Sequence, residues 1–248
     1  MYNESIIEAS KILKRANYAI AFTGAGISTE SNIPDFRGSQ GLWKKFDPKM
    51  ASRSYFKENP DGFWEFYAKR YEVIANAQPN DAHKALVILE NSNYIKHIIT
   101  QNIDRLHSKA GSKSVIELHG NILMSYCDSC FREKSTEECI NEFYKTKKAP
   151  KCDYCGDFMR PAVVLFEESV KLIDVAMEIA YRSDCCLVIG SSLTVYPAAF
   201  IPEIIKRQGG DLIIVNFDNT PLDNIADIVI KDKASTVLKK IIENMELK

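Results

Sequence analysis

The sequence predicts an α/β fold, a Rossmann-like doubly wound parallel sheet that carries a smaller inserted helical and zinc-binding domain. Short apolar runs, each followed by small or polar residues, alternate along the chain with helical patterns. The first run ends in the glycine turn Gly24-Ala25-Gly26, which is typical of nucleotide-binding sheets. Four cysteines form two closely spaced pairs in a stretch with little strand pattern.

The composition is that of a chain with a sizeable core. Of 248 residues, 46% are hydrophobic, and 32 basic side chains face 33 acidic ones. This balance gives no global field that would attract nucleic acid or an anionic membrane, and no run has the ~18 apolar residues of a membrane span. We therefore expect a cytoplasmic monomer that binds neither nucleic acid nor a membrane directly.

The chain is expected to open with an amphipathic helix. Apolar residues recur at helical spacing at Ile6, Ala9, Leu13 and Ala16. Ser5 and Glu8 have the spacing of a capping box, which would start the helix at Ser5. The apolar run at residues 18–22 then predicts a buried strand before the glycine turn.

Four further apolar runs predict buried strands, and they are Ile95–Ile99, Val115–Leu118, Cys185–Ile189 and Leu212–Val215. Ligands of such sheets bind beyond the carboxyl ends of the strands. Residues 1–37, 81–120 and 161–248 are therefore assigned to the Rossmann-like nucleotide-binding part. The aromatic-rich residues 38–80 are expected to form a helical insertion and residues 121–160 a zinc-binding module, within one domain spanning 1–248.

The cysteine pattern C-x2-C-x21-C-x2-C consists of Cys127, Cys130, Cys152 and Cys155. Two tight turns that each present two thiolates complete the closed tetrahedral cage of a structural zinc ion, which leaves no position for a catalytic water. The alternative is four buried free cysteines, which would not require two equal spacings. We expect the other three cysteines to take no part.

The glycine turn alone does not specify a function. It resembles the start of a dinucleotide fingerprint, but Thr29 stands where the third glycine would be, and no acidic residue ends a strand ~20 residues later. A nicotinamide-dependent oxidoreductase remains an alternative on this motif, and a nucleic-acid-binding zinc ribbon remains one on the cysteines.

The full stretch from Thr23 to Gly38, TGAGISTESNIPDFRG, resembles the NAD-binding signature of the sirtuins, which are NAD-dependent protein-lysine deacylases. The resemblance continues in family order through TQNID at 100–104, HG at 119–120, the four cysteines, GSSL at 190–193 and VN at 215–216. It covers nearly the whole chain. It implies NAD as the co-substrate and one structural zinc ion. It also implies proteins with acylated lysines as partners, with chromatin-associated proteins as one class of them.

The resemblance also implies which residues bind NAD. The glycine turn would hold the diphosphate, the loop at 35–37 would cover the nicotinamide ribose, and a polar group including Ser28 would receive nicotinamide. The implied set is Gly24, Ala25, Gly26, Ser28, Asp35, Phe36, Arg37, Gln101, Asn102, Ile103, Asp104, Gly190, Ser191, Ser192, Asn216 and Asp218. Taken singly, Ser28, Asn102 and Asp104 would be interpreted as ordinary capping and turn residues.

His119 and Asn102 are the implied catalytic residues. In the implied reaction, the acyl-lysine oxygen attacks the ribose carbon that loses nicotinamide. His119 then deprotonates a ribose hydroxyl, which attacks the resulting imidate, and water releases free lysine and O-acyl-ADP-ribose. Mono-ADP-ribosyl transfer to protein is the nearest alternative within the family.

Substrate contacts are also implied. Val164, Phe166 and Val195 would bind the peptide as an added strand. Glu167 replaces a family glycine there, and its charge would narrow peptide choice or favour basic flanking residues. Asn32 replaces another glycine, and asparagine tolerates the left-handed backbone best among the other residues.

Tyr67 and Arg70 match the Tyr-x-x-Arg pair of sirtuins that remove succinyl or malonyl groups, and Ala51 lies in a stretch resembling the neighbouring wall of that pocket. We predict an acyl pocket from these three residues, with deacetylation also retained. The alternative is an aromatic helix core beside a solvated arginine.

Overall fold

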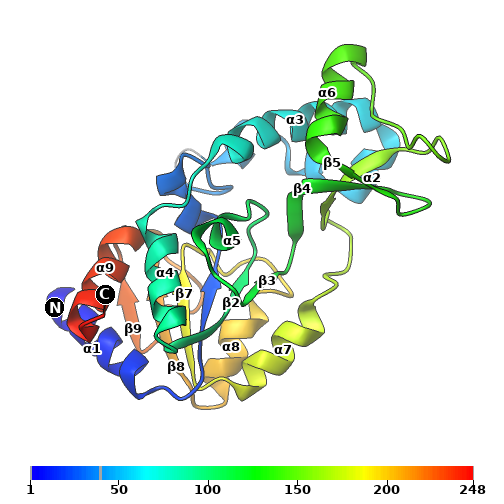
Figure 1. The fold of residues 1–248 in the computed structure, drawn as a ribbon. Helices are drawn as coiled ribbons and strands as arrows, with labels where there is room; N and C mark the ends of the chain where they lie inside the picture. The colour runs from blue at the N-terminus through cyan, green and yellow to red at the C-terminus, as the bar shows by residue number, and fades with distance from the viewer. Residues whose placement is uncertain (1, 39–40, 248) are drawn as a thin grey trace.

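The computed structural model describes residues 2–38 and 41–247 and has two lobes (Figure 1). The larger lobe holds a six-stranded sheet between two layers of helices. The smaller lobe holds a three-stranded sheet and the remaining helices. The predicted α/β class with a smaller inserted part is confirmed. Within the described residues, no helix combines the length and apolarity needed to cross a membrane.

All neighbouring strands of the large sheet are parallel. In spatial order they are β3 (Val115–Glu117), β2 (Ile95–Thr100), β1 (Ala19–Thr23), β7 (Cys185–Ile189), β8 (Asp211–Val215) and β9 (Ile228–Ile230). The chain leaves β1 toward β2 and β3 and later returns on the other side of β1. The strand order therefore reverses between β1 and β7, and a ligand crevice is expected at their carboxyl ends.

Helices cover both faces of this sheet, as Figure 1 shows. One layer contains α1 (Tyr2–Arg15), α4 (Asp81–Asn91) and α9 (Ala234–Met245), and the other contains α7 (Ile173–Arg182) and α8 (Phe200–Arg207). Successive strand side chains point to opposite faces. In β1, Ala19 and Ala21 pack in the first layer, whereas Ile20 and Phe22 pack in the second.

The helix α1 starts earlier than predicted. It begins at Tyr2, so Ser5 lies inside the helix and the predicted capping box is wrong. The apolar stripe was predicted correctly, since Ile6, Ala9 and Leu13 are all buried. Burial of that stripe against α9 and the sheet positions the helix, whatever its first residue.

Short helices follow the first two strands of the large sheet. The 3₁₀ helix η1 (Ala25–Ser31) follows β1, and α5 (Leu106–Ala110) follows β2. Asn32 ends η1 with φ 61°, the left-handed backbone expected for this asparagine.

The smaller lobe contains η2 (Leu42–Lys44), η3 (Pro48–Ala51), α2 (Arg53–Glu58), α3 (Pro60–Asn76), β4 (Gly120–Cys127), β5 (Glu133–Ser135), α6 (Thr136–Thr146) and β6 (Met159–Val163). Its antiparallel sheet has the order β5-β4-β6. These strands were not predicted, because β5 is short and polar, and β6 carries an arginine and a proline. An aromatic core joins the sheet to α3, where Trp64 Nε1 donates to the Met159 carbonyl.

Candidate functional site

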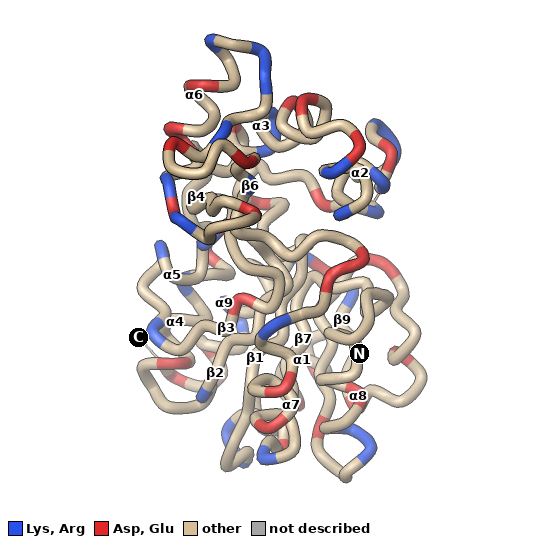
Figure 2. The backbone as a smooth tube through the Cα atoms, turned by 90° about the vertical axis from the view of Figure 1, so that its right-hand side faces the viewer, with Lys and Arg blue, Asp and Glu red and all other residues tan. Residues whose placement is uncertain are grey.

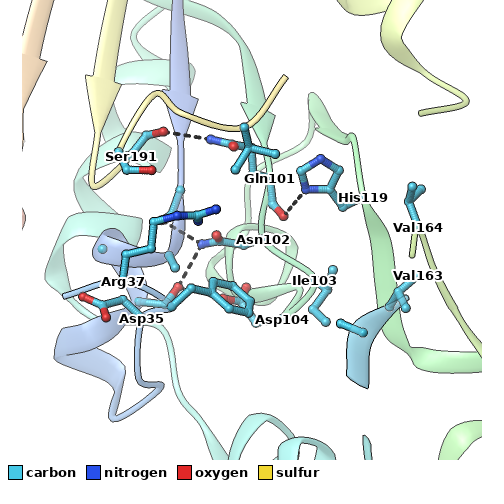
Figure 3. A pocket seen from close by; sticks show the side chains of 18 of the residues that line it. Asp35, Arg37, Gln101, Asn102, Ile103, Asp104, His119, Val163, Val164 and Ser191 are labelled. Carbon is cyan, nitrogen blue, oxygen red and sulfur yellow. Dashed lines mark hydrogen bonds between the residues drawn. The ribbon is translucent and has the colours of Figure 1, made fainter. Parts of the chain in front are cut away.

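A cavity of about 300 Å³ lies at the carboxyl ends of β1, β2 and β7 and extends to the smaller lobe. Every residue predicted to bind NAD, the acyl group or the peptide, or to act in catalysis, lines it. Figure 3 shows part of this lining, with side chains from several separate segments. The fold therefore brings all these predicted residues together, and only the four cysteines lie elsewhere.

The glycine turn packs against the loop that follows β7. A Cβ on Gly24 would lie 2.8 Å from the Gly190 carbonyl oxygen, and one on Gly26 would lie 2.6 Å from the Gly190 Cα. Gly190 itself has φ 61°. Two backbones approach so closely that no side chain fits between them. The close packing of the two backbones therefore requires glycine at these positions, whether or not a diphosphate binds there.

Three buried polar side chains form a connected group at one end of the cavity. Asn102 Nδ2 donates to Gly24 O and to Ser28 Oγ, at 3.1 Å each. Ser28 Oγ donates to Asp104 Oδ2 at 2.7 Å, and the Leu106 amide donates to Asp104 Oδ1. Burial raises the pKa of Asp104, although these hydrogen bonds oppose the rise.

The loop at 35–38 and the ends of β2 and β7 border the same space (Figure 3). Asp35 Oδ1 accepts the Gly38 amide at 2.9 Å, and the Phe36 carbonyl accepts the Trp43 amide at 3.0 Å. Gln101 Nε2 donates to Ser191 Oγ at 2.9 Å, which links the ends of the two strands. The loop, held by its own turn and by η2, can cover a ligand bound beside the two strand ends.

His119 is half-buried, and Figure 3 shows its ring beside Gln101. Its Nδ1 lies 2.9 Å from the Gln101 carbonyl oxygen, which can only accept. The ring proton is therefore on Nδ1, and Nε2 carries a free lone pair. Burial lowers the pKa of His119, although the Gln101 contact opposes this, so the ring is neutral at pH 7. Such a ring can accept a proton.

The four cysteines of the predicted cage lie together, with their sulfur atoms within 4.8 Å of one another. Cys127 Sγ is 3.3 Å from Cys155 Sγ, and Cys130 Sγ is 3.6 Å from Cys152 Sγ. Four sulfurs ~2.3 Å from a tetrahedral zinc ion are separated by about 3.8 Å, so the cluster fits this metal. The alternative of four unrelated buried cysteines is excluded.

The family model of the Sir2 family matches residues 24–197. The chain belongs to the Sir2 family. It is 54% identical over 233 residues to an NAD-dependent protein deacetylase of Saccharolobus solfataricus, covering 94% of each chain. It is 46% identical over 242 residues to an NAD-dependent protein deacylase of Pyrococcus furiosus, covering 96% of this chain and 97% of the other.

Solved Sir2 structures have the same fold. A Sir2 complex with deacetylated p53 peptide and 3'-O-acetyl-ADP-ribose has a TM-score of 0.94 at 38% identity, covering 97% of this chain and 98% of the other. A Sir2 complex with p53 peptide and NAD⁺ has a TM-score of 0.90 at 38% identity, covering 95% and 96%. These molecules bind peptide and NAD-derived ligands, as their names state.

Arg70, which was predicted to belong to an acyl pocket, lines the cavity and lies among aromatic rings. The Arg70 guanidinium carbon lies 5.0 Å from the centre of the Phe36 ring and 5.6 Å from the rings of Phe66 and Tyr67. Among the described residues, no carboxylate lies within 4.0 Å of Arg70. Burial lowers its pKa, and a hydrogen bond with Tyr67 opposes that shift. Arg70 is thus a partly buried cation that lines the cavity, and the carboxylate of Asp104, which lines the same cavity, also interacts with its charge.

The segment predicted to bind peptide is fixed along one edge. The amide groups of Val164 and Phe166 donate to the His119 and Ala51 carbonyls, at 2.9 and 3.0 Å. Glu167 has φ 77°, and its carboxylate accepts from the Ser54 amide and hydroxyl at 2.8 Å each. The carboxylate of Glu167 is thus hydrogen-bonded at the start of α2. The sequence had instead suggested that this charge would act on the peptide.

Several lining residues escaped the sequence prediction, among them Ile33, Trp43, Ile74, Leu165 and Tyr196. Trp43 packs against Phe36 with tilted rings whose centres are 5.0 Å apart, and its ring centre lies 6.1 Å from that of Phe166. The aromatic richness of residues 38–80 was the available signal. It could not separate the residues facing the cavity from those in the core.

Proposed function

We propose that this chain, an NAD-dependent protein deacylase, transfers acyl groups from lysine side chains to ADP-ribose with His119 as general base. The observation that carries this proposal is the free Nε2 of a neutral His119 in a cavity that also contains the Asn102 group. In the proposed division of the chain, the part that binds NAD consists of residues 1–37, 81–120 and 161–248. Residues 38–80 cover the acyl group, and 121–160 form the zinc-binding module.

The lining fits NAD. The backbones of the glycine turn and of Ser191 border one part of the cavity, where no side chain blocks a diphosphate. Asn102 and Asp104, both buried, provide amide and carboxylate groups suited to a carboxamide such as that of nicotinamide. When bound, NAD supplies a ribose carbon that becomes electrophilic as nicotinamide departs.

The protein residues exclude water from the reacting groups and accept a proton from them. The loop containing Phe36 closes the ribose side and keeps water from the reacting carbon. His119 takes a proton onto Nε2 from a ribose hydroxyl, and the Gln101 carbonyl stabilises the resulting imidazolium through Nδ1–H. Because Val164 N is bonded to the His119 carbonyl, the peptide-binding segment and the base share one frame.

The substrate is an acylated lysine in a protein chain. We propose that its backbone lies along Val164, Phe166 and Val195, whose side chains line the cavity. Because the amides of Val164 and Phe166 are already engaged, the peptide would pair through its own donors. A chromatin-associated substrate, a monomeric state and a cytoplasmic location remain predictions from the sequence.

The acyl pocket supports acceptance of acidic acyl groups. A succinyl-lysine ends in a carboxylate, which is costly to remove from water unless a charge meets it. Arg70, which lies among three aromatic rings and forms no direct ion pair within the described residues, supplies that charge. Ala51, with its small side chain, leaves room at the wall.

The test compares acetyl-, succinyl- and fatty-acyl-lysine peptides with NAD in wild type, Arg70→Met and Lys69→Met. Loss of a buried charged partner costs ~2 kcal/mol or more, so Arg70→Met should lower kcat/KM for succinyl peptide ~30-fold and change acetyl turnover much less. Lys69, exposed on the same helix and paired with Glu65, is the matched control. Equal losses on both peptides would show that Arg70 is structural.

A further inference from the structure

Two buried histidines lie beneath the cavity and take no part in the proposed reaction. His83 in α4 and His107 in α5 are 0% and 2% exposed, and their ring centres are 4.9 Å apart. Each ring leaves one nitrogen without a hydrogen-bond partner, Nε2 of His83 and Nδ1 of His107. Buried polar atoms without partners are rare, so this arrangement requires an explanation.

The surrounding hydrogen bonds determine both tautomers. The Thr23 hydroxyl donates to Thr100 Oγ1 at 2.8 Å, so its oxygen accepts from His107 Nε2–H at 2.9 Å. The lone nitrogen of His107 is thus an acceptor. His83 Nδ1 accepts the Asn80 amide at 3.4 Å, so its proton is on Nε2. The two unpaired nitrogens are therefore a donor and an acceptor, complementary across the ring pair.

Both rings are neutral at pH 7. Burial lowers the pKa of His83 to about 4 and that of His107 to about 3, with the neighbouring His83 adding to the latter shift. A neutral imidazole donates at one nitrogen and accepts at the other. No hydrogen bond joins the two rings, which are in contact only, and the donor nitrogen of His107 is the one that binds Thr23.

The chain of hydrogen bonds ends at the reaction site. Thr100 Oγ1 also accepts a hydrogen bond from the backbone amide of Asn102 at 3.1 Å. The side-chain Nδ2 of Asn102 donates to Gly24 and Ser28. On the far side of the ring pair, Asn80 Nδ2 donates to the Ile27 carbonyl at 2.8 Å. His107 is thus connected by hydrogen bonds to the segment after β2, whereas His83 reaches it only through ring contact with His107.

We propose that His107 is a positioning residue, which acts through Thr23 and Thr100, with His83 behind it, to hold Asn102 in the orientation that receives nicotinamide. The role of Asn102 rests on the proposed function. The hydrogen-bond chain itself does not, and it is tested separately. Without the Nε2–H donor of His107, the hydroxyl groups of Thr23 and Thr100 can rotate to another hydrogen-bonding arrangement. The backbone amide of Asn102 then loses its fixed acceptor, Thr100 Oγ1.

Three variants at one position separate this role from simple packing. In His107→Gln the amide nitrogen reaches the place of Nε2 and can still donate to Thr23. In His107→Asn it reaches only the place of Nδ1, and His107→Leu has no donor. We expect the KM for NAD to rise about tenfold or more in the Asn and Leu variants, because each loses roughly one buried hydrogen bond. In the Gln variant the KM for NAD should stay near the wild-type value. The KM for peptide should be unchanged.

The control is His97→Leu. His97 also lies on the large sheet, in β2, but its ring bonds Tyr18 and Ser114, away from the cavity. This variant should lose stability and keep its KM for NAD. Thr23→Val and Thr23→Ser provide a second pair, since serine keeps the hydroxyl and valine does not.

Amide hydrogen exchange without NAD gives the independent readout. Exchange at 100–104 and 23–28 should accelerate in His107→Leu and His107→Asn but not in His107→Gln. If Gln and Leu behave alike in exchange, the positioning role is overturned, whatever the enzyme does. If exchange follows the prediction but no variant alters the KM for NAD, the chain of hydrogen bonds stands and the assigned role of Asn102 fails.

Discussion

At the scale of single residues, neighbours decide what a histidine can do. The chain has four histidines, and all are hydrogen-bonded. Only His119 both lines the cavity and has its proton held by a carbonyl oxygen, which leaves Nε2 as a base. The sequence-based choice of His119 rested on its resemblance to the catalytic position of the sirtuins, and the Gln101 contact shows which ring nitrogen can act as a base.

His119→Ala should lower kcat by ~10²-fold or more, because the variant keeps the cavity but has no group to accept the ribose proton. NAD affinity and the melting temperature should stay close to wild type, since the His119 side chain is only half-buried. Steady-state turnover, calorimetric NAD binding and thermal unfolding measure these quantities. A folded variant with near-wild-type turnover would remove His119 from the mechanism.

At the scale of elements, the zinc-binding module depends on metal more than on packing. One cysteine pair begins at the last residue of β4, and the other lies just before β6. Cys155 is exposed and Cys130 only partly buried. The strands β4 and β6 pack into the aromatic core of the smaller lobe, but the cysteine turns beyond them bury less surface, so we expect the metal to hold these turns together.

We expect one zinc per chain in protein purified without added zinc. Cys130→Ser should lose the metal, unfold the small sheet and lower activity indirectly, because a structural zinc contributes folding free energy. Cys139→Ser is the matched control, since Cys139 is fully buried in the same lobe but outside the cage. Metal analysis measures the outcome, and active enzyme with almost no zinc contradicts it.

At the scale of the whole molecule, Figure 2 shows basic and acidic residues interspersed over both lobes. This agrees with the near-zero net charge of −1 and gives no support to a nucleic-acid-binding function. Stability against acid therefore depends on individual buried groups more than on general charge repulsion. Among these groups, His83 and His107 have the most strongly lowered histidine pKa values.

The free energy of unfolding should fall as the pH drops below about 6.5, the pKa of an unfolded histidine. Between there and about pH 4, the unfolded chain binds protons that folded His83 does not. At about 1.4 kcal/mol per pKa unit, His83 alone accounts for a loss of roughly 3 kcal/mol. Urea unfolding at pH 7.5, 5.5 and 4.5 measures it. The double variant His83→Gln with His107→Gln should lose less unfolding free energy between pH 7.5 and 4.5. An equal loss would show that other titrating groups cause the acid sensitivity.

The sequence was a good guide wherever neighbours in the chain carry the signal. The buried strands β1, β2, β7 and β8 were predicted because parallel strands covered on both faces form continuous apolar runs. β9 was missed because its short apolar run has no turn signal to mark it, and β4 to β6 were missed because cysteines, charged residues and a proline interrupt the strand pattern there. Tertiary contacts stabilise these strands where local propensity does not.

The sequence by itself determined the family, the zinc ligands and the residues that gather in the cavity, because paired cysteines and strand-end motifs are local and keep their order. Only the tertiary structure decided what those side chains do. It set the tautomer of His119, caged Arg70 with rings, engaged Glu167 at α2 and joined His83 to His107. Each of these depends on a partner far along the chain, and burial with hydrogen bonding, which sequence spacing does not encode, determines the result.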